Sequence, residues 1–391
     1  MNNTIKLAVA SALLAAASTA SAAGGIVAGD WTLDIGGNVN AFASTTNAKV
    51  TQGTAPVGGL AGTRDTLGEK TANGINTGLL PSWIGFSGKT RQNDLDVDFT
   101  ISLQPNVSDN SAAGDADTPL NRQAFVSFGD KSWGSIKLGK DLGIFAADAI
   151  LNDMTLLGVG GASANSGTAT TLGGIGSGYI YAAWKGQVSY TSPNFNGFSF
   201  TAGITNPNQG FGTLNQDRFG LEGKASYAFT GDVSGKVWAS AASYDVTASS
   251  TSQYKANAFD VGATVSAAGF GLTGYYYNGE GAGTTVFGAN GATAAGAKRD
   301  SDGGYVQATY TLPGVGTKLG AAYGVSKLDL AAGETNNTLI SKNERITVGA
   351  YHPITKHLNL VAEYNNVQSE AQVKTNKTES NAVSLGAILF F

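Results

Sequence analysis

Residues 218–229 read RFGLEGKASYAF, and the order of side chains in this stretch decides the fold. Every second residue from Phe219 to Phe229 is apolar, aromatic or glycine, whereas the residues between them include Glu222 and Lys224. Successive side chains of a β-strand point to opposite faces, so a period of two predicts a strand. One face of this strand suits an apolar medium, and the other, which carries the charges, suits water.

The same alternation recurs along the chain. Residues 96–104, 198–205 and 358–365 each set apolar side chains against polar ones, with Asp98 and Glu363 on the polar faces. A soluble β-sandwich would also alternate. Aromatic residues, however, lie repeatedly near the strand ends, where transmembrane barrels carry girdles at the lipid–water boundary. These residues are Trp31, Trp83, Trp184, Phe229, Tyr310, Tyr364 and Phe391.

The composition favours a membrane barrel over a soluble protein. Charged residues make up 13% of the chain, against roughly a quarter in soluble domains. After the N-terminal segment no apolar run of about 18 residues occurs, so no helix is predicted to cross a membrane. A barrel places its lipid contacts in every second residue, which fits this composition. A secreted β-sandwich or β-helix has a similar composition, but the strand pattern favours the barrel.

Short and long connections alternate between the predicted strands. The short turns fall at about 89–94, 129–132, 192–197, 230–232, 268–271, 312–316 and 353–357, and the long loops at about 45–80, 105–120, 140–178, 206–217, 245–255, 279–303, 328–343 and 368–378. This arrangement is typical of outer-membrane barrels. It predicts an all-β fold, a transmembrane antiparallel β-barrel of about 16 strands that closes on itself and encloses a water-filled lumen.

The N-terminus has the features of an export signal. Lys6 precedes an apolar run at 7–17, and the small residues at 20–22 form a cleavage site. We therefore expect residues 1–22 to be a cleaved signal peptide and residues 23–391 to form a single barrel domain. The chain contains no cysteine, so neither disulfides nor thiolate metal sites are expected.

The alternation stops for about 40 residues at 139–178, which read GKDLGIFAADAILNDMTLLGVGGASANSGTATTLGGIGSG. Loops longer than about 15 residues in a compact domain are usually functional or disordered. This one is poor in charge and rich in Gly, Ala, Ser and Thr. We therefore expect the third long loop, 140–178, to fold inward into the space that the strands enclose.

Several stretches resemble the Gram-negative general porins, a family of sixteen-stranded trimeric barrels. NRQAFVSF at 121–128 and GSIKLGK at 134–140 are similar to the strand, turn and strand that precede the family's third loop. SWIGFSG at 82–88 resembles its second strand, and YTSPNFNGF at 190–198 resembles the turn after the constriction loop. The chain also ends in phenylalanine, as most of these proteins do. The resemblance spans nearly all of residues 23–391.

This resemblance implies that the third loop narrows the pore. Asp148 and Asp153 match the acidic half of the family's constriction, whereas Arg122 matches a basic position on the opposite wall, with Lys137 as a second. TLLGVGG at 155–161 stands where enteric relatives carry an acidic segment, and Trp83 and Ser87 occupy the basic positions of the second strand.

Further charges follow from strand parity rather than from the resemblance. Asp98, Glu222, Lys224 and Glu363 lie on lumen-facing positions and are expected to line the pore. An Arg or Lys on the lipid face at mid-depth would cost about 2–4 kcal/mol, so charges on the strands are expected to face the lumen or the rim.

The sequence offers little support for catalysis, metal binding or nucleic-acid binding. His352 and His357 flank a turn that contains a proline, and no third ligand stands at metal-binding spacing. No G-x-S-x-G motif occurs, and GGIGSG at 173–178 lacks the dinucleotide-binding spacing. The net charge of −4 is spread without a basic patch. We expect no enzyme activity, no cofactor, no metal and no nucleic acid.

The predicted function is a passive, water-filled channel for ions and small hydrophilic solutes. It would lie in the outer-membrane lipid of a Gram-negative bacterium, as a homotrimer. A slight acidic surplus after residue 22 favours cations. A solute-selective channel and, less favoured, a surface adhesin on a barrel scaffold remain as alternatives. At the C-terminus, apolar residues alternate up to Phe391, and we expect this end to pair with the first strand near 31–40 and close the barrel.

Overall fold

The computed structural model describes residues 25–65, 67–105, 107, 119–161, 170–206, 218–249 and 252–391. The predicted signal peptide, 1–22, lies outside the described residues, as do most of the loop expected at 105–120 and of that expected at 206–217. Among the described residues, no helix is long and apolar enough to cross a membrane.

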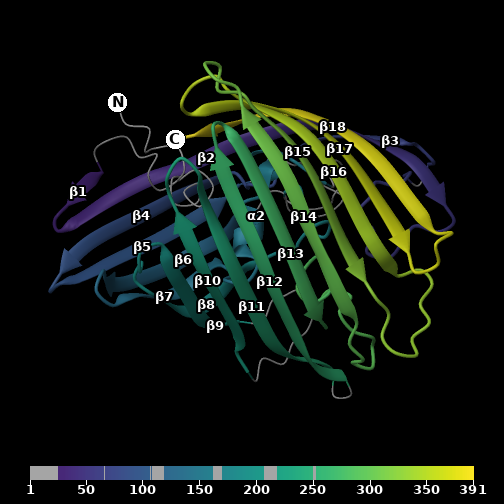
Figure 1. Ribbon diagram of the computed structural model, residues 1–391, viewed down its shortest axis with the longest axis horizontal. Coiled ribbons are helices and arrows are strands. Elements are labelled where there is room, and N and C mark those ends of the chain that lie inside the picture. Colours follow the sequence, from purple (N-terminus) through teal and green to yellow (C-terminus); the bar gives the residue numbers. More distant parts are fainter. Residues whose placement is uncertain are drawn as a thin grey trace.

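The described strands form a closed antiparallel barrel (Figure 1). Its sheet contains 18 strands, of which β1 (Ile26–Ala28) and β3 (Thr71–Asn76) are short additions to the long strand β2. The other sixteen follow one another around the ring, which confirms the predicted fold class. They are β2 (Trp31–Gln52), β4 (Trp83–Gln92), β5 (Leu95–Gln104), β6 (Leu120–Asp130), β7 (Gly134–Leu142), β8 (Trp184–Thr191), β9 (Phe198–Thr205), β10 (Gly220–Phe229), β11 (Ser234–Ser249), β12 (Ser252–Ala267), β13 (Phe270–Glu280), β14 (Asp300–Thr311), β15 (Lys318–Leu328), β16 (Ile340–Pro353), β17 (Leu358–Ala371) and β18 (Lys377–Phe390).

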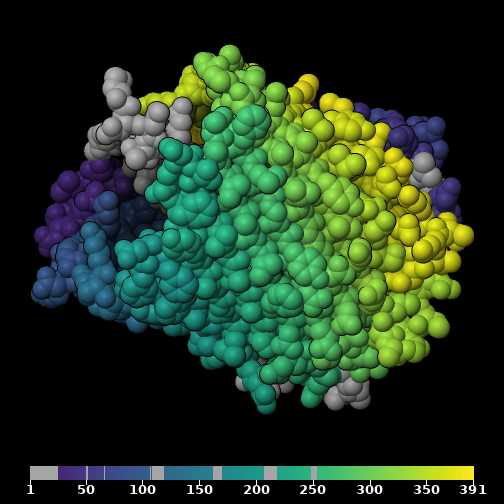
Figure 2. Space-filling view, in the orientation of Figure 1, coloured from purple at the N-terminus to yellow at the C-terminus, as the bar shows by residue number. Residues whose placement is uncertain are grey.

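The two faces of the strands differ as the alternation predicts. On β10, Leu221 lies on the outer face and is 58% exposed, whereas its neighbour Glu222 lies on the inner face and is 4% exposed. On β17, Leu360 and Tyr364 are exposed and Glu363 is buried. Figure 2 shows the outer faces of the strands from the teal part of the chain to the yellow part as one continuous surface. The apolar outer face follows from the period of two.

Trp83 does not lie on the outer face, where the aromatic girdle was expected. It is the first residue of β4, but its side chain lies on the inner face, where it is buried. A Cβ placed on Gly85 would come within 2.3 Å of the Trp83 ring. The glycine two residues further along the strand therefore leaves room for the indole inside the barrel.

Three of the predicted long loops are shorter than expected because their flanking strands extend. Strand β2 continues to Gln52 and β3 forms within the expected loop 45–80, while β11 ends at Ser249 and β12 begins at Ser252. The expected loop 368–378 shrinks to the residues between β17 and β18. Polar side chains occupy both faces of these extensions, as at Thr45 and Thr46, so the ladder continues beyond the apolar band that marked the strands in the sequence.

Two short helical turns lie in the connection between β7 and β8. They are α2 (Ala147–Leu151) and the 3-10 turn η2 (Met154–Leu157). Figure 1 shows α2 behind the strands that face the viewer. Buried residues of this connection pack with inner-face residues such as Trp238 and Tyr275 in the main apolar cluster, so the core of the molecule lies inside the barrel.

The ring closes where β18 pairs with β2, from Lys377 opposite Gln52 to Phe390 opposite Asn38. Beyond β18, the Phe391 N–H donates to the Gly37 carbonyl at 3.1 Å, and the Gly37 N–H donates to the Phe391 carbonyl at 3.0 Å. A Cβ on Gly37 would lie 2.2 Å from the Trp83 carbonyl oxygen and 2.8 Å from the Phe391 ring, so a glycine is required at this crossing. The end of β18 thus lies against the expected range 31–40.

We predict that deletion of Phe391 lowers the yield of folded barrel in the outer membrane several-fold. The deletion removes two backbone hydrogen bonds, each contributing about 1 kcal/mol, at an edge that lipid cannot satisfy. Folded barrel is measured as the heat-modifiable band in gel electrophoresis of membrane fractions. Phe391→Tyr keeps the backbone pairing and serves as the control. An unchanged yield from the deleted chain would contradict a role for Phe391 in closure.

Candidate functional site

The segment 143–183 contacts the inner wall of the barrel, and its first contacts are with β10 and β11. The backbone N–H groups of Ile144 and Phe145 donate to Glu222 Oε2 at 2.6 and 3.0 Å. The next N–H, of Ala146, donates to Ser240 Oγ at 3.2 Å. Lys185 Nζ donates to the other carboxylate oxygen, Glu222 Oε1, at 2.6 Å, and the Glu222 side chain is completely buried.

The middle of the segment is held by β14. Gln307 accepts from the Met154 N–H at 2.8 Å and donates to the Asn152 carbonyl at 2.6 Å. The Tyr305 hydroxyl donates to the Ala149 carbonyl at 2.8 Å. These side chains supply hydrogen-bond partners to irregular backbone that would otherwise be buried without them.

The far side of the segment reaches β17. Glu363 Oε2 accepts from the N–H groups of Val159 and Gly160 at 3.0 and 2.7 Å, and the Tyr351 hydroxyl donates to its Oε1 at 2.7 Å. Glu222 therefore fixes one side of the segment and Glu363 the other. Each carboxylate accepts hydrogen bonds from two consecutive backbone N–H groups, and such charge-assisted hydrogen bonds are stronger than neutral ones.

Asp153 organises the segment itself. Its carboxylate accepts from the N–H groups of Thr155 and Gly174, both at 2.9 Å, and from the Tyr179 hydroxyl at 2.8 Å. Arg345 Nη2 of β16 lies 3.6 Å away, and both charged side chains are almost completely buried. Asp153 therefore joins the two branches of the segment and connects them to the wall.

Asp148 is bound by two lysines of the wall. Lys224 Nζ of β10 lies 3.2 Å from Asp148 Oδ2, and Lys236 Nζ of β11 donates to Oδ1. Burial of the Asp148 carboxyl raises its pKa, but the two ammonium groups lower the pKa by more, and the balance lies below the ordinary value for aspartate. These ion pairs are therefore present at neutral pH and are lost only as pH falls through that lowered pKa.

An outer connection, 281–299, packs on the segment from the side of β13 and β14. Phe287 is 1% exposed, and its ring centroid lies 5.7 Å from that of Phe145 and 4.8 Å from that of Tyr244. The Tyr181 N–H donates to the Thr285 carbonyl at 2.8 Å. Together with the contacts to Glu222, Gln307 and Glu363, this connection places buried protein against inner faces of strands between β10 and β17.

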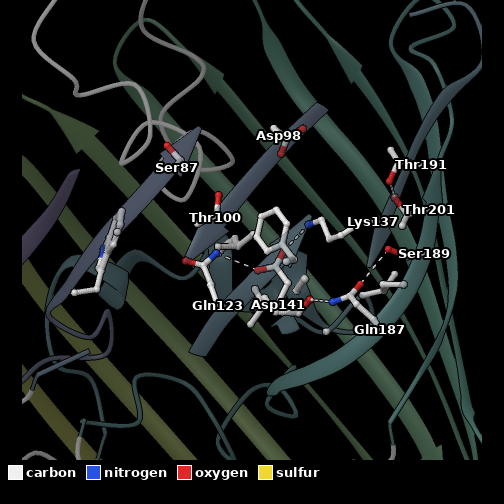
Figure 3. A pocket seen from close by; sticks show the side chains of 18 of the residues that line it. Ser87, Asp98, Thr100, Gln123, Lys137, Asp141, Gln187, Ser189, Thr191 and Thr201 are labelled. Carbon is white, nitrogen blue, oxygen red and sulfur yellow. Dashed lines mark hydrogen bonds and ion pairs between the residues drawn. The ribbon is translucent and has the colours of Figure 1, made fainter. Parts of the chain in front are cut away.

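A cavity of about 460 Å³ remains beside the segment, next to the opposite wall (Figure 3). Its lining combines hydroxyl, amide, charged and apolar side chains. The lining residues are Asp34, Ile35, Gly36, Trp83, Gly85, Ser87, Asp98, Thr100, Gln123, Phe125, Lys137, Asp141, Leu142, Gly143, Ile144, Ala147, Leu151, Gln187, Ser189, Thr191, Thr201 and Lys224.

The charges at the cavity come from the strands. Lys137 is paired with Asp141, four residues along the same face of β7, and its ammonium lies 4.5 Å from the centre of the Phe125 ring. Gln123 Nε2 donates to Asp141 at 3.1 Å. Asp98 accepts from the hydroxyl of Ser127. Figure 3 shows Lys137, Asp141 and Gln123 close together, with Asp98 further along the wall.

The predicted site residues fall into separate groups. Asp98, Lys137 and Lys224 line the cavity, and Asp148 touches it only through Lys224. The remaining carboxylates, Asp153, Glu222 and Glu363, lie between the segment and the wall and are not among the residues that line the cavity.

Arg122 is not brought together with the predicted acidic residues. The register between β5 and β6 shifts at this point, because Ser102 faces Gln123 whereas Leu103 faces Asn121. Gln123 lines the cavity, as Phe125 does two residues further along the strand, while the Arg122 guanidinium lies 6.0 Å from the centre of the Trp184 ring. Arg122 is the extra residue of this bulge, and it is not among the residues that line the cavity.

Sequence reasoning missed Asp34, Asp141 and Lys236. Asp141 could have been found, because a residue four positions from Lys137 on a strand shares its face. Strand parity could also have indicated Asp34 as an inward residue of the first long strand. Nothing in the sequence links Lys236 to Asp148 across 88 positions, since that contact depends on how the segment lies against the wall.

Comparison with known proteins identifies the family. A family model described as Gram-negative porin matches residues 8–372. The chain belongs to this family. Porins form channels in the outer membrane, and the protein is an outer-membrane channel for the diffusion of ions and small solutes. No curated protein matches the chain.

Solved structures share the fold of this porin at low sequence identity. The outer-membrane channel DcaP of Acinetobacter baumannii has 14% identity, covering 94% of this chain and 100% of its own, with a TM-score of 0.68. An anion-selective porin from Comamonas acidovorans has 16% identity, with coverage of 92% and 100% and a TM-score of 0.64. The trimer form of OmpT from Vibrio cholerae has 16% identity, with coverage of 92% and 99% and a TM-score of 0.55.

The described part of the porin contains no group of three or more His, Asp or Glu side chains that could hold a metal ion. His352 Nδ1 is instead 2.8 Å from the Thr317 hydroxyl.

We predict that Asp148→Asn shifts the ion preference of the porin toward anions. The change leaves Lys224 and Lys236 without their carboxylate, and their charge acts on ions in a confined space, so the cation-to-anion permeability ratio should fall by roughly twofold. Reversal potentials in a salt gradient measure the ratio.

Asp245→Asn is the matched control for this change. Asp245 also lies near two cationic groups, Arg218 at 3.4 Å and Lys255 at 3.8 Å, but it does not line the cavity. The control should leave the ratio unchanged. An equal ratio in native protein and the Asp148 variant would show that this cluster does not act on permeating ions.

Proposed function

We propose that the cavity beside the segment 143–183 is the narrowest part of a passive, water-filled passage through the barrel. The observation that carries the proposal is the asymmetry of the interior. The segment makes buried contacts with β10, β14 and β17, whereas polar side chains such as Thr100, Gln187 and Thr201 line a space on its other side. Ions and small hydrophilic solutes would cross there down their own gradients, without an energy source.

The segment 143–183, which includes most of the expected loop 140–178, sets the width of this passage. Its fixed contacts to Glu222 and Glu363 support a rigid constriction rather than a movable plug. Lys137, Lys224 and Asp98 act directly on a passing solute, and Asp148 acts through Lys224. We place Asp153 in the support of the constriction, and Arg122 outside it.

The charges at the cavity favour a weak preference for cations. Three aspartates and two lysines are among its lining residues, which leaves one negative charge in surplus. Charges in a narrow passage act on ions more strongly than charges in bulk water. The Comamonas relative is anion-selective, so the preference of this chain rests on its own lining rather than on the fold.

We further propose that the porin is exported with cleavage after residue 22 and assembles as a homotrimer in outer-membrane lipid. The trimer form of the Vibrio OmpT structure supports this assembly. The apolar outer faces of the strands, with Leu221 and Leu385 well exposed, provide the surface for lipid and for neighbouring subunits.

The proposed function predicts open channels in a planar lipid bilayer. Purified protein without residues 1–22 should conduct in salt solution with no energy source, and the current should rise in events that each divide into three equal levels. Three levels are expected because each barrel of a trimer contains its own passage. Folded protein that gave no conductance would contradict the channel, and single-level events would contradict the trimer.

A further inference from the structure

The short helix α2 keeps its one charged side chain apart from its apolar side chains. Ala147 and Leu151, which are four residues apart and share a helix face, line the cavity. Asp148 is paired with Lys224 and Lys236 of the wall. Ala147 and Ile150 are members of the main apolar cluster, and Leu151 packs against it. The only charged side chain of the helix, Asp148, is therefore not among the residues that line the cavity, and the helix residues that do line it are apolar.

The other lining residues that the structure describes in this segment, which covers 143–161 and 170–183, are also apolar. Its lining residues are Gly143, Ile144, Ala147 and Leu151, and none of them carries a polar side chain. Phe125 of β6 adds an aromatic ring from the wall. The side of the constriction that resemblance to other porins would make acidic is thus an apolar strip.

The strip faces a wall that offers polar groups and both signs of charge. Thr100 and Gln187 supply neutral hydrogen-bonding groups, while Lys137, Lys224 and Asp98 supply charge. Apolar surface attracts the apolar part of a solute from water, and a few placed polar groups orient the rest. A solute with a charged or polar head and an apolar side can satisfy both sides at once.

We propose that this porin favours small amphipathic solutes, and in particular zwitterionic amino acids with apolar side chains. The inference rests on the proposed function, because it assigns a solute class to the same passage. The carboxylate of such a solute would meet Lys137 or Lys224 and its ammonium group Asp98, while its side chain passes along Leu151 and Ile144. A solute of equal size with a polar side chain gains nothing from the strip.

Liposome swelling with purified porin lacking residues 1–22 tests the proposal, with leucine and glutamine as probes of similar size and zero net charge. The native porin should admit leucine faster than glutamine. Leu151→Asn should lower the leucine-to-glutamine rate ratio by about twofold or more, since the variant replaces apolar surface at the cavity by an amide. Ala147→Ser is a smaller change on the same helix face and should lower the ratio less. This second variant still tests the proposal if the Leu151→Asn protein does not fold.

Leu67→Asn is the control, because Leu67 is 87% exposed in an outer connection and does not line the cavity. It should leave the ratio unchanged. Equal rates for the two probes in native porin, or a ratio that Leu151→Asn and Ala147→Ser both leave unchanged, would overturn the solute preference while the channel stands. Folded native porin that admitted neither probe and conducted no ions would overturn the proposed function itself.

Discussion

Lipid offers no hydrogen-bond partners, so every backbone N–H and C=O that crosses the membrane must be satisfied within the protein. The chain meets this constraint by pairing β18 with β2, from Lys377 opposite Gln52 to Phe390 opposite Asn38, and by the backbone pair between Phe391 and Gly37. A ring without a free edge encloses a space that the inner side chains of sixteen strands cannot fill. The barrel therefore needs the segment 143–183 to shape its interior.

Holding irregular backbone inside a barrel has consequences for electrostatics. Glu222 and Glu363 each accept two consecutive N–H groups of the segment, and Asp153 joins the two branches of the segment beside Arg345. Carboxylates that are used in this way are buried and do not face the cavity. The charge at the cavity is then supplied by the barrel wall, at residues such as Lys137, and the segment contributes apolar surface.

The alternation along the chain predicted the strands because lipid and water lie on opposite faces, as the contrast between Leu221 and Glu222 illustrates. The position of the segment was also predictable, since alternation stops there. The contacts of the segment were not predictable, because strand parity gives the face on which a residue lies but not what packs against it. Glu363, for example, has the inward parity of a lining residue, but its carboxylate accepts hydrogen bonds from the backbone N–H groups of Val159 and Gly160. Arg122 was assigned to the constriction by resemblance, and the period of two could not show that it lies at a bulge between β5 and β6.

We propose that solutes pass along the cavity wall formed by β2 and β4–β10 rather than along β14–β16. The chain has no cysteine, so single cysteines placed at Thr100, which lines the cavity, and at Ala322, buried in the cluster with Met154, report on the two sides. The most direct measurement is the channel current in a planar bilayer during addition of a positively charged methanethiosulfonate reagent. The account predicts a stepwise loss of current for Thr100→Cys and none for Ala322→Cys. Block of Ala322→Cys with an unaffected Thr100→Cys channel would contradict it.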